Sequence, residues 1–398
     1  MLYYMFQDTY DAFFEDSRQA DWEALDNLLA RPWWSRTWVV QEVWHSANAL
    51  LQCGGTTLKW KTVEKAMCYQ EGWDDMGCLV KKTSRWQLWD TLKRRYGLAV
   101  HISQKRLLGS KLSDLLWNMW DREATDPRDK VFAVLGLVGE EYAEPLPCID
   151  YSKPMGRIYR ETAASVIRGE KSLDILLAAS GAGSGEDELP SWVPDWRREA
   201  NDERPALFIN GSRMRILVYF SGSTDVVLLH GHGYSASGDM EPSVRFDEEL
   251  NVLHARGFLF DVVAHVTSVE EGVAASHIVE AARSTLMPSV EAHPGLRGVT
   301  NDDLKVILRA GGFADPSTLR PEDQVIENIM RRRSFFVTTS GRLGIGPSDT
   351  RQGDDIAILA GCNFPMVLRP GDSSHHIVVG EAYGKYSPGL EWFPIVVD

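Results

Sequence analysis

The sequence lacks any apolar run long enough to cross a bilayer. Among its 398 residues the best apolar stretches are short, such as 131–138, whereas a spanning helix needs roughly 18 to 20 apolar residues. Residues 1–16 contain no Lys or Arg, so the basic start of a secretory signal is missing as well. These two absences predict a cytoplasmic protein that does not bind a membrane.

Positive charge is also scarce. Lys and Arg together number 42 against 56 Asp and Glu, which gives a formal net charge of −14. The one tight basic run is Arg331-Arg332-Arg333, and we interpret it as the solvated end of a helix, because a nucleic-acid footprint needs a whole basic face. A chain of this charge repels polyanions, so we expect no nucleic acid partner.

Cysteine is rare and scattered. None of the five forms a C-x-x-C pair or a zinc-like spacing. A structural disulfide framework is therefore excluded, and a reducing compartment is expected. The cysteines are Cys53, Cys68, Cys78, Cys148 and Cys362.

Motifs for the standard catalytic chemistries are absent. The nearest approach to the G-x-S-x-G turn of serine hydrolases lies at 230–237, where Ser237 occupies the place of the second glycine. The sequence has no phosphate-binding G-x-x-x-x-G-K-[ST]. His230 and His232 have the spacing of two metal ligands on a strand, but no third ligand accompanies them. We therefore predict neither a cofactor nor a metal, and we expect that this chain alone is not an enzyme.

The sequence does contain two kinds of periodicity, which predict an α/β to α+β fold. Region 59–198 is mainly helical by pattern, 199–330 mixes strands and helices, and 331–398 consists of short strands divided by glycines. The last region predicts a small C-terminal sheet or barrel. Strands are expected at 47–53, 214–220, 226–230, 250–257, 259–266, 334–339, 355–359, 365–368 and 376–379.

A tryptophan-rich block at 33–44 places four tryptophans in twelve positions, so it must face a core or a partner. On a helix, Trp38, Gln41 and Glu42 share one face. That face could present Glu42 to a ligand. The alternative is that Glu42 pairs with Arg36 or another base while Trp38 fills the core.

A helix start is predicted at 126–130. Asp126 suits the N-cap, Pro127 suits the first helical turn, and Asp129 complements the positive end of the helix dipole. We expect the helix to end near Gly136. Arg128 and Lys130 complete this charged motif, in which a regulatory salt-bridge network is a secondary possibility.

Two of these blocks carry a family resemblance. Residues 31–42, followed by Cys53-Gly54-Gly55, resemble the closing motif of the fungal heterokaryon incompatibility (HET) domain. Residues 124–137 resemble a second hallmark stretch of these proteins. The resemblance then continues in order along the chain, through 150–154, 159–163, 189–196, 342–347, 353–354, 365–369 and 379–383.

The resemblance implies that residues 1–58 are the C-terminal remnant of a HET domain with a TIR-like fold. The opening strand that ends in Trp-Gly and the Cys-Ile-Asn-Gln block of such domains do not occur here. We therefore expect a truncated domain.

The function implied is non-self recognition and programmed cell death signalling through protein contacts. The partner would be another protein of unknown identity, and the oligomeric state stays open. An alternative is an NAD or nucleotide hydrolase that is incomplete in this chain, with Glu42 as a weak catalytic candidate. A third reading is a degenerate scaffold that binds partners through its tryptophans, which exposure of Trp33 or Trp34 would favour.

Overall fold

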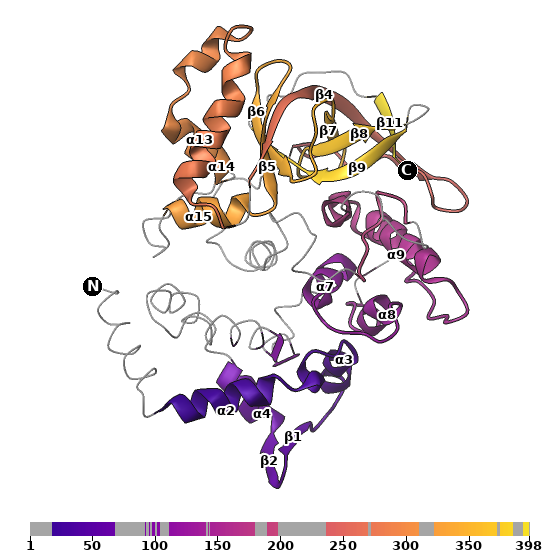
Figure 1. Cartoon of the computed structure of the whole chain (residues 1–398). Helices are drawn as coiled ribbons and strands as arrows, with labels where there is room; N and C mark the ends of the chain where they lie inside the picture. The colour runs from indigo at the N-terminus through magenta and orange to yellow at the C-terminus, as the bar shows by residue number, and fades with distance from the viewer. Residues whose placement is uncertain are drawn as a thin grey trace. The chain divides into compact units, whose positions relative to one another are not determined.

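The computed structural model divides the chain into two compact units (Figure 1). The first unit comprises Met1–Ser110, Asp114–Val138 and Asp315–Arg320, and the second comprises the remaining residues. The structure describes residues 18–67, 92, 95, 98–99, 102–103, 111–140, 142, 144–179, 189–197, 236–269, 272–309, 322–371, 375–384 and 393–397.

The first unit is mainly helical in its described part. Its one described sheet is a two-stranded hairpin, so the expected TIR-like remnant is not confirmed. Its elements are α2 (Gln19–Leu29), η2 (Pro32–Trp34), α3 (Trp38–Trp44), β1 (Leu50–Cys53), β2 (Thr56–Lys59), α4 (Trp60–Met67), α7 (Leu112–Met119), whose first two residues belong to the second unit, and α8 (Asp129–Leu135).

The buried strand predicted at 47–53 is a shorter and more exposed strand. β1 pairs only with β2, through a two-residue turn at Gly54-Gly55, and Leu50 is 62% exposed. Gly54 adopts a φ of +58°, a conformation that favours glycine. The prediction was wrong about burial because, in the described part of the chain, no third strand pairs with this hairpin, and an isolated two-stranded hairpin buries little of its surface.

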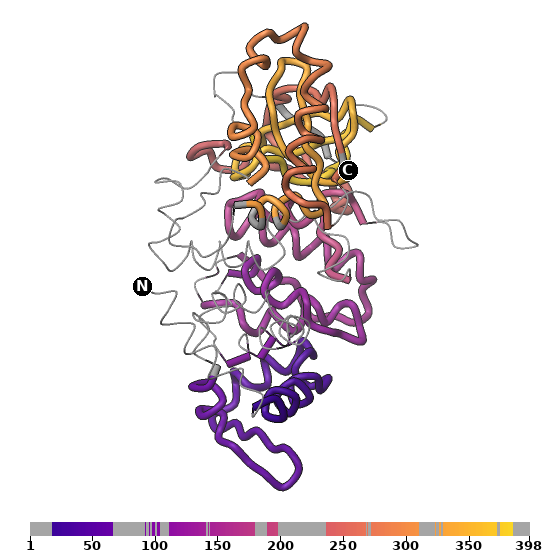
Figure 2. Tube along the Cα trace, turned by 60° about the vertical axis from the view of Figure 1, so that its left-hand side comes forward, coloured from indigo at the N-terminus to yellow at the C-terminus, as the bar shows by residue number. Residues whose placement is uncertain are grey.

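The second unit combines helices with a larger sheet, and Figure 2 follows its chain trace from magenta to yellow. Its helices are α9 (Met155–Glu170), η4 (Asp174–Ala178), α13 (Ala275–Leu286), η5 (Met287–Ser289), η6 (Pro294–Gly298), α14 (Asn301–Leu308) and α15 (Glu322–Met330). Its strands are β3 (Val244–Phe246), β4 (Leu253–Ser268), β5 (Arg333–Thr338), β6 (Leu343–Pro347), β7 (Asp355–Leu359), β8 (Met366–Pro370), β9 (His376–Glu381), β10 (Tyr383–Gly384) and β11 (Phe393–Val397).

The strands of the second unit close into a barrel. β4 pairs with β5 near its C-terminal end and with β7 near its middle. From β5 the pairing continues to β6 and then to β10. β10 follows β9 directly in the chain. β9 pairs with β8, which pairs with β7. At one end β11 joins the start of β4 to the start of β9. The expected C-terminal sheet is thus a closed antiparallel barrel with one parallel contact.

An apolar core fills this barrel. It is formed by Val263, Phe336, Ile356, Val367, Val379 and Ala382, with Phe260 and Val266 packed against it. Glycine makes room for the largest of these side chains, because a Cβ at Gly344 would lie 2.5 Å from the Phe336 ring. A side chain on β6 at that position would therefore displace the ring from the core.

The strand predictions compare with the structure as follows. Those in the C-terminal region are confirmed as β5, β7, β8 and β9. The two strands expected at 250–257 and 259–266 are one long strand, β4, whose pairing register shifts at two places. Bulges let one strand bend and pair with different neighbours along its length. The strands expected at 214–220 and 226–230 lie outside the described residues.

The interpretation of the arginine triplet is wrong for its last member. Arg333 is the first residue of β5 and is fully buried, where it forms an ion pair with Glu381 of β9. Arg331 is exposed, and Arg332 adopts a φ of +59°. The left-handed residue turns the chain from α15 into β5 and directs the third arginine inward.

None of the helices in the described ranges combines the length and apolar character that crossing a bilayer requires.

Candidate functional site

The two motif blocks of the first unit pack against each other. Helix α3 of the first block contacts α8 of the second. Nε2 of His45 lies 3.1 Å from the carbonyl oxygen of Gly136. A Cβ at Gly136 would come within 1.9 Å of Nε2 of Gln41, so the Gln41 side chain covers this glycine. We call the region formed by residues 34–45 and 120–136 the motif junction.

A buried arginine ties the motif junction together. Arg122 has no exposed surface, and its guanidinium donates to the carbonyl oxygens of Trp34, at 2.9 Å, and Leu98, at 2.6 Å. Burial lowers the pKa of Arg122 to about 9, although the negative charge of Asp121 opposes the shift. The carbonyl oxygens thus replace the water that a charged side chain would otherwise need.

Backbone pairing reinforces this contact at Glu123, which directly precedes the second block. Glu123 N donates to Ser35 O at 2.7 Å, and Thr37 N donates to Glu123 O at 3.0 Å. The hydroxyl of Thr37 also donates to Glu123 O, at 2.9 Å, while the hydroxyl of Ser35 donates to the Glu123 carboxylate, at 2.9 Å. Arg36 lies in this bridge opposite Glu123.

Lys130 supports the same segment from α8. Its Nζ donates to the carbonyl oxygen of Trp120 at 2.9 Å and also to that of Arg122. These carbonyl groups follow the end of α7, where backbone acceptors lack helical partners. Lys130 therefore donates to the carbonyl groups that follow α7, and its ammonium group is directed toward the protein backbone.

The charged turn before α8 differs in detail from the prediction. The helix begins at Asp129, directly after Arg128, and ends before Gly136 as expected. Asp126 accepts from the Arg128 backbone N–H at 3.0 Å and from its guanidinium at 2.9 and 2.6 Å. The hydrogen bonds of Arg128 lower the pKa of Asp126. Asp126 and Arg128 thus form a closed local pair around Pro127, and Asp129 lies in the first helical turn as predicted.

The three residues of the predicted face of α3 differ in burial. Glu42 is exposed, Gln41 is half-buried, and the core positions of α3 are Val39 and Val40 rather than Trp38, which is half-buried. The short helix buries two of its three valines, Val39 and Val40, whereas the sequence drew attention to the tryptophans.

The tryptophans of the first block are mostly covered. Trp34 is buried and Trp33 is half-buried. The Trp33 ring lies edge-on to the Trp34 ring, with centroids 4.9 Å apart, and 6.0 Å from the Trp60 ring of α4. These rings therefore form a small aromatic cluster in which each indole shields another.

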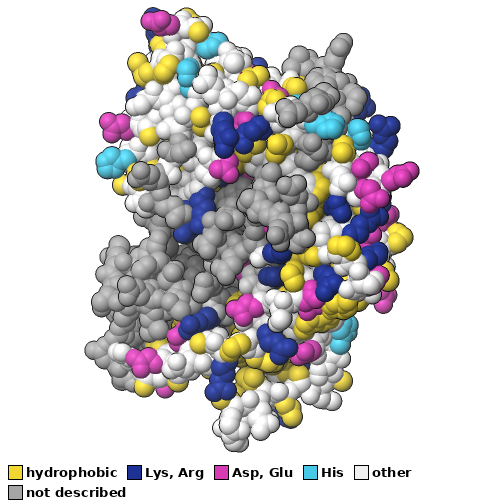
Figure 3. Space-filling model, turned by 45° about the vertical axis from the view of Figure 1, so that its right-hand side comes forward, with side chains coloured by type: hydrophobic (Ala, Val, Ile, Leu, Met, Phe, Trp, Pro, Cys, Tyr) yellow, Lys and Arg dark blue, Asp and Glu magenta, His cyan; other side chains and the backbone are white. Residues whose placement is uncertain are grey.

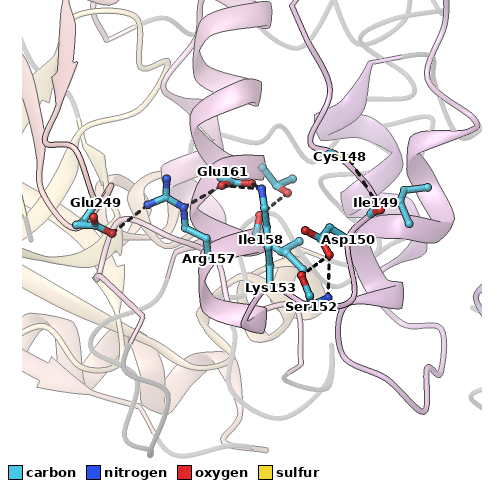
Figure 4. A network of polar contacts seen from close by, with 10 residues as sticks. Cys148, Ile149, Asp150, Ser152, Lys153, Arg157, Ile158, Glu161 and Glu249 are labelled. Carbon is cyan, nitrogen blue, oxygen red and sulfur yellow. Dashed lines mark hydrogen bonds and ion pairs between the residues drawn. The ribbon is translucent and has the colours of Figure 1, made fainter.

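In the second unit, the motif at 150–154 leads into α9 through a polar network (Figure 4). Asp150 accepts from Ser152 N at 2.8 Å and from its hydroxyl at 2.6 Å. Glu161 accepts from Lys153 at 2.9 Å and from Arg157 at 2.8 Å. Burial would raise the pKa of Glu161, but these two cations outweigh it and lower the pKa.

The motif at 189–196 docks onto the barrel. The Ser191 hydroxyl oxygen accepts from the backbone N–H of Val378 in β9 at 2.9 Å. The indole N–H of Trp192 donates to the Asn251 carbonyl oxygen at 3.1 Å. The Trp196 ring packs edge-on against Tyr159 of α9, with centroids 4.9 Å apart. This segment therefore connects α9 to the barrel.

Sequence reasoning missed a polar group on the barrel. Asp261 of β4 accepts from the Thr339 hydroxyl at 2.9 Å, from Ser340 N at 3.3 Å and from the Ser340 hydroxyl. Burial raises the pKa of Asp261, but the hydrogen bonds that it accepts outweigh burial and lower its pKa. A single acid in the apolar stretch 258–263 was the available signal, because such an acid needs partners when it is buried. Asp261 anchors the turn between β5 and β6.

Figure 3 shows one face of the molecule with its side chains coloured by type. In the face drawn in Figure 3, Lys and Arg side chains alternate with Asp and Glu among apolar atoms. Within the described ranges, no cluster of three or more His, Cys, Asp or Glu could hold a metal ion.

Comparisons with known proteins agree with the motif series. Residues 294–386 match the family model of the Het-6 beta-barrel domain. The chain is 22% identical, over 441 aligned positions, to heterokaryon incompatibility protein 6, OR allele, from Neurospora crassa. The alignment covers 89% of this chain and 64% of the relative, so the chain spans less than two thirds of that protein. No solved structure matches it. Residues 294–386 are therefore similar to the Het-6 β-barrel domain, and the resemblance of the chain to HET-domain-containing proteins is confirmed.

Proposed function

We propose that this chain acts in heterokaryon incompatibility, by recognising non-self after cell fusion and signalling cell death through contacts with other proteins. The observation that carries this proposal is the similarity to heterokaryon incompatibility protein 6, which extends over 89% of the chain. The match of residues 294–386 to the Het-6 barrel family agrees with it.

The arrangement of the motif junction fits a contact-based mechanism. Its charged side chains, Arg122 and Lys130, donate to backbone carbonyl oxygens, and Asp126 pairs with Arg128. These hydrogen bonds and this ion pair fix the two blocks relative to each other. We infer that the junction is a rigid support for a recognition surface.

Induced expression in a filamentous fungus tests the proposal. We expect expression of the chain in a host of different incompatibility type to slow colony extension and lower cell viability. Expression in a host of its own type would serve as the control. Unchanged growth in every host type, with folded protein detected in the cells, would contradict the proposal.

The variant Glu42→Gln separates this mechanism from hydrolysis of NAD or another nucleotide. Glu42 is exposed and lies away from the buried positions of α3. If the response depends on protein contacts elsewhere, Glu42→Gln should leave it unchanged. Loss of the response together with loss of NAD consumption would favour the hydrolase instead.

A further inference from the structure

The segment that leads into α9 has a burial pattern with a period of three. Residues 144, 147 and 150 are half-buried, whereas residues 145, 146, 148 and 149 are exposed. A polyproline II helix has three residues per turn, so one of its edges can rest on a protein while the other two face solvent. A β-strand would instead alternate with a period of two.

The residue types agree with this conformation. Pro145 and Pro147 fix their own φ near −65° and restrict the residues before them, Glu144 and Leu146, to extended conformations. Within the described structure, no backbone N–H of residues 146–149 donates a hydrogen bond to another backbone group. Polyproline II has no internal backbone hydrogen bonds and leaves its backbone to solvent.

The segment is bonded to α9 at its start, and a local turn follows at its end. At the start, the Ser165 hydroxyl of α9 donates to the Pro145 carbonyl oxygen at 3.2 Å. At the end, Asp150 accepts from Ser152, and Figure 4 shows Ile149 directed away from this contact. A segment fixed in this way has lost its conformational freedom before it meets a partner, which reduces the entropic cost of binding.

The exposed side chains are apolar. Leu146 is 36% exposed and Ile149 is 53% exposed. Residues three apart lie on the same edge of a polyproline II helix, so these two side chains form one apolar edge. They account for two of the eight large apolar side chains that are exposed in the described part of the chain. Acidic residues precede this edge, at Glu140, Glu141 and Glu144.

We propose that residues 144–150 form a polyproline II ligand for another protein, whose binding groove is lined with aromatic side chains and is basic at the end that receives the acidic residues. Aromatic-lined grooves recognise this conformation because its shape is formed in advance. The acidic run selects a basic groove by charge complementarity. This proposal supplies a contact surface for the proposed function and rests on it.

Binding to purified SH3 and WW domains of Neurospora crassa tests the proposal. Each domain is titrated into the full chain, and binding is followed by calorimetry at low and high salt. We expect saturable 1:1 binding by at least one domain with a basic groove, and weaker binding as salt increases. Leu146→Asp and Ile149→Asp should each weaken that binding at least tenfold.

Met287→Asp is the matched control. Met287 is another exposed apolar side chain of the second unit, at 57% exposure, so its replacement should leave binding unchanged. The thermal unfolding midpoint of each variant checks that the chain still folds. The proposal is overturned if no domain binds saturably, or if all three variants have the same affinity as the unmodified chain. A growth defect without such binding would retain the proposed function and reject this segment as its contact.

Discussion

The motif junction of the first unit and the barrel of the second unit use buried charge in different ways. In the junction, Arg122 donates to the carbonyl oxygens of Trp34 and Leu98. In the barrel, Arg333 is equally buried but faces the carboxylate of Glu381. The first arrangement joins segments through their backbones, whereas the second adds a specific side-chain pair to a closed ladder of strands. Helix ends and loops expose carbonyl groups that a cation can satisfy. In the barrel most carbonyl groups are paired within the strand ladders, and Arg333 adds only a longer contact, at 3.5 Å, to the Glu381 carbonyl oxygen.

The largest expected effect concerns how many residues the barrel needs in order to fold. The family match covers 294–386, but β4 and β11 lie outside that range, and β4 separates β5 from β7. We expect a polypeptide of residues 294–386 to remain unfolded, because it lacks Val263 of the core and leaves strand edges unpaired. Circular dichroism during heating measures this. A polypeptide of residues 139–398 should unfold cooperatively, and cooperative unfolding of the shorter one would contradict the prediction.

Breaking the barrel pair should have the largest effect among single substitutions. Burial lowers the pKa of Arg333 to about 10, although Glu381 opposes this shift. Arg333→Met leaves the Glu381 carboxylate buried without its cation, which should lower the free energy of unfolding by about 3–5 kcal/mol. The double variant Arg333→Met/Glu381→Leu should recover most of this loss, since it removes both charges. Urea unfolding of the three chains provides the test, and a double variant as unstable as the single one would refute this explanation.

Replacing Arg122 should lower the free energy of unfolding by less than replacing Arg333. A second substitution should not restore the loss. Arg122→Met leaves two buried carbonyl oxygens without donors, so we expect a loss of about 2–4 kcal/mol. The acceptors belong to the backbone, so no second substitution can remove them, although the charge of Asp121 acts on the Arg122 guanidinium. Arg36→Met, at an exposed position, is the control and should change stability by less than about 0.5 kcal/mol. If Arg122→Met and Arg36→Met lowered the free energy of unfolding equally, the hydrogen bonds of the buried Arg122 would contribute nothing to stability.

The sequence predicted the barrel better than the junction, for physical reasons. Short apolar runs between glycines are a local signal, so β5, β7, β8 and β9 were found at nearly their observed bounds. The sequence left a sheet and a barrel as alternatives, because closure depends on register shifts in β4 that let one strand pair with several neighbours. In the junction, each motif was recognised, but the contact between them spans more than eighty residues of chain. Arg122 gave no signal, since a lone arginine in a polar stretch is ordinarily exposed.

Glycine substitutions compare the packing of the two units directly. In the second unit, a Cβ at Gly169 of α9 would lie 2.6 Å from the Tyr142 ring and 2.9 Å from Cβ of Glu144. Gly169→Ala should therefore cost about 1–3 kcal/mol through overpacking. In the first unit, the obstacle at Gly136 is the amide end of Gln41, which can move. Gly136→Ala should cost less than Gly169→Ala when both are measured by denaturant unfolding.

A double variant identifies the cause at Gly136. If the Gln41 side chain is the obstacle, Gln41→Ala should restore most of the stability that Gly136→Ala removes. The coupling free energy of the two substitutions then measures the contact between the two motif blocks. Additive effects would contradict the packing of Gln41 on Gly136.

The smallest effect concerns pH and compares Asp261 of the barrel with Asp126 of the junction. Both carboxylates have a lowered pKa in the folded chain. A lowered pKa contributes stability that is present above the unfolded value, near 3.9, and is lost as the pH falls through the folded value. Asp261→Asn should therefore destabilise the chain more at pH 6 than at pH 3. Asp126→Asn should show the same sign with a smaller amplitude, because its carboxylate is more exposed to solvent than that of Asp261. Urea unfolding between pH 3 and pH 7 measures both, with Asp239→Asn, an exposed position, as the background for removing one charge. If the loss at Asp261 were independent of pH, its hydrogen-bond partners would stabilise the ionised and protonated carboxyl groups equally, and the charge of Asp261 would contribute nothing to the β5–β6 turn.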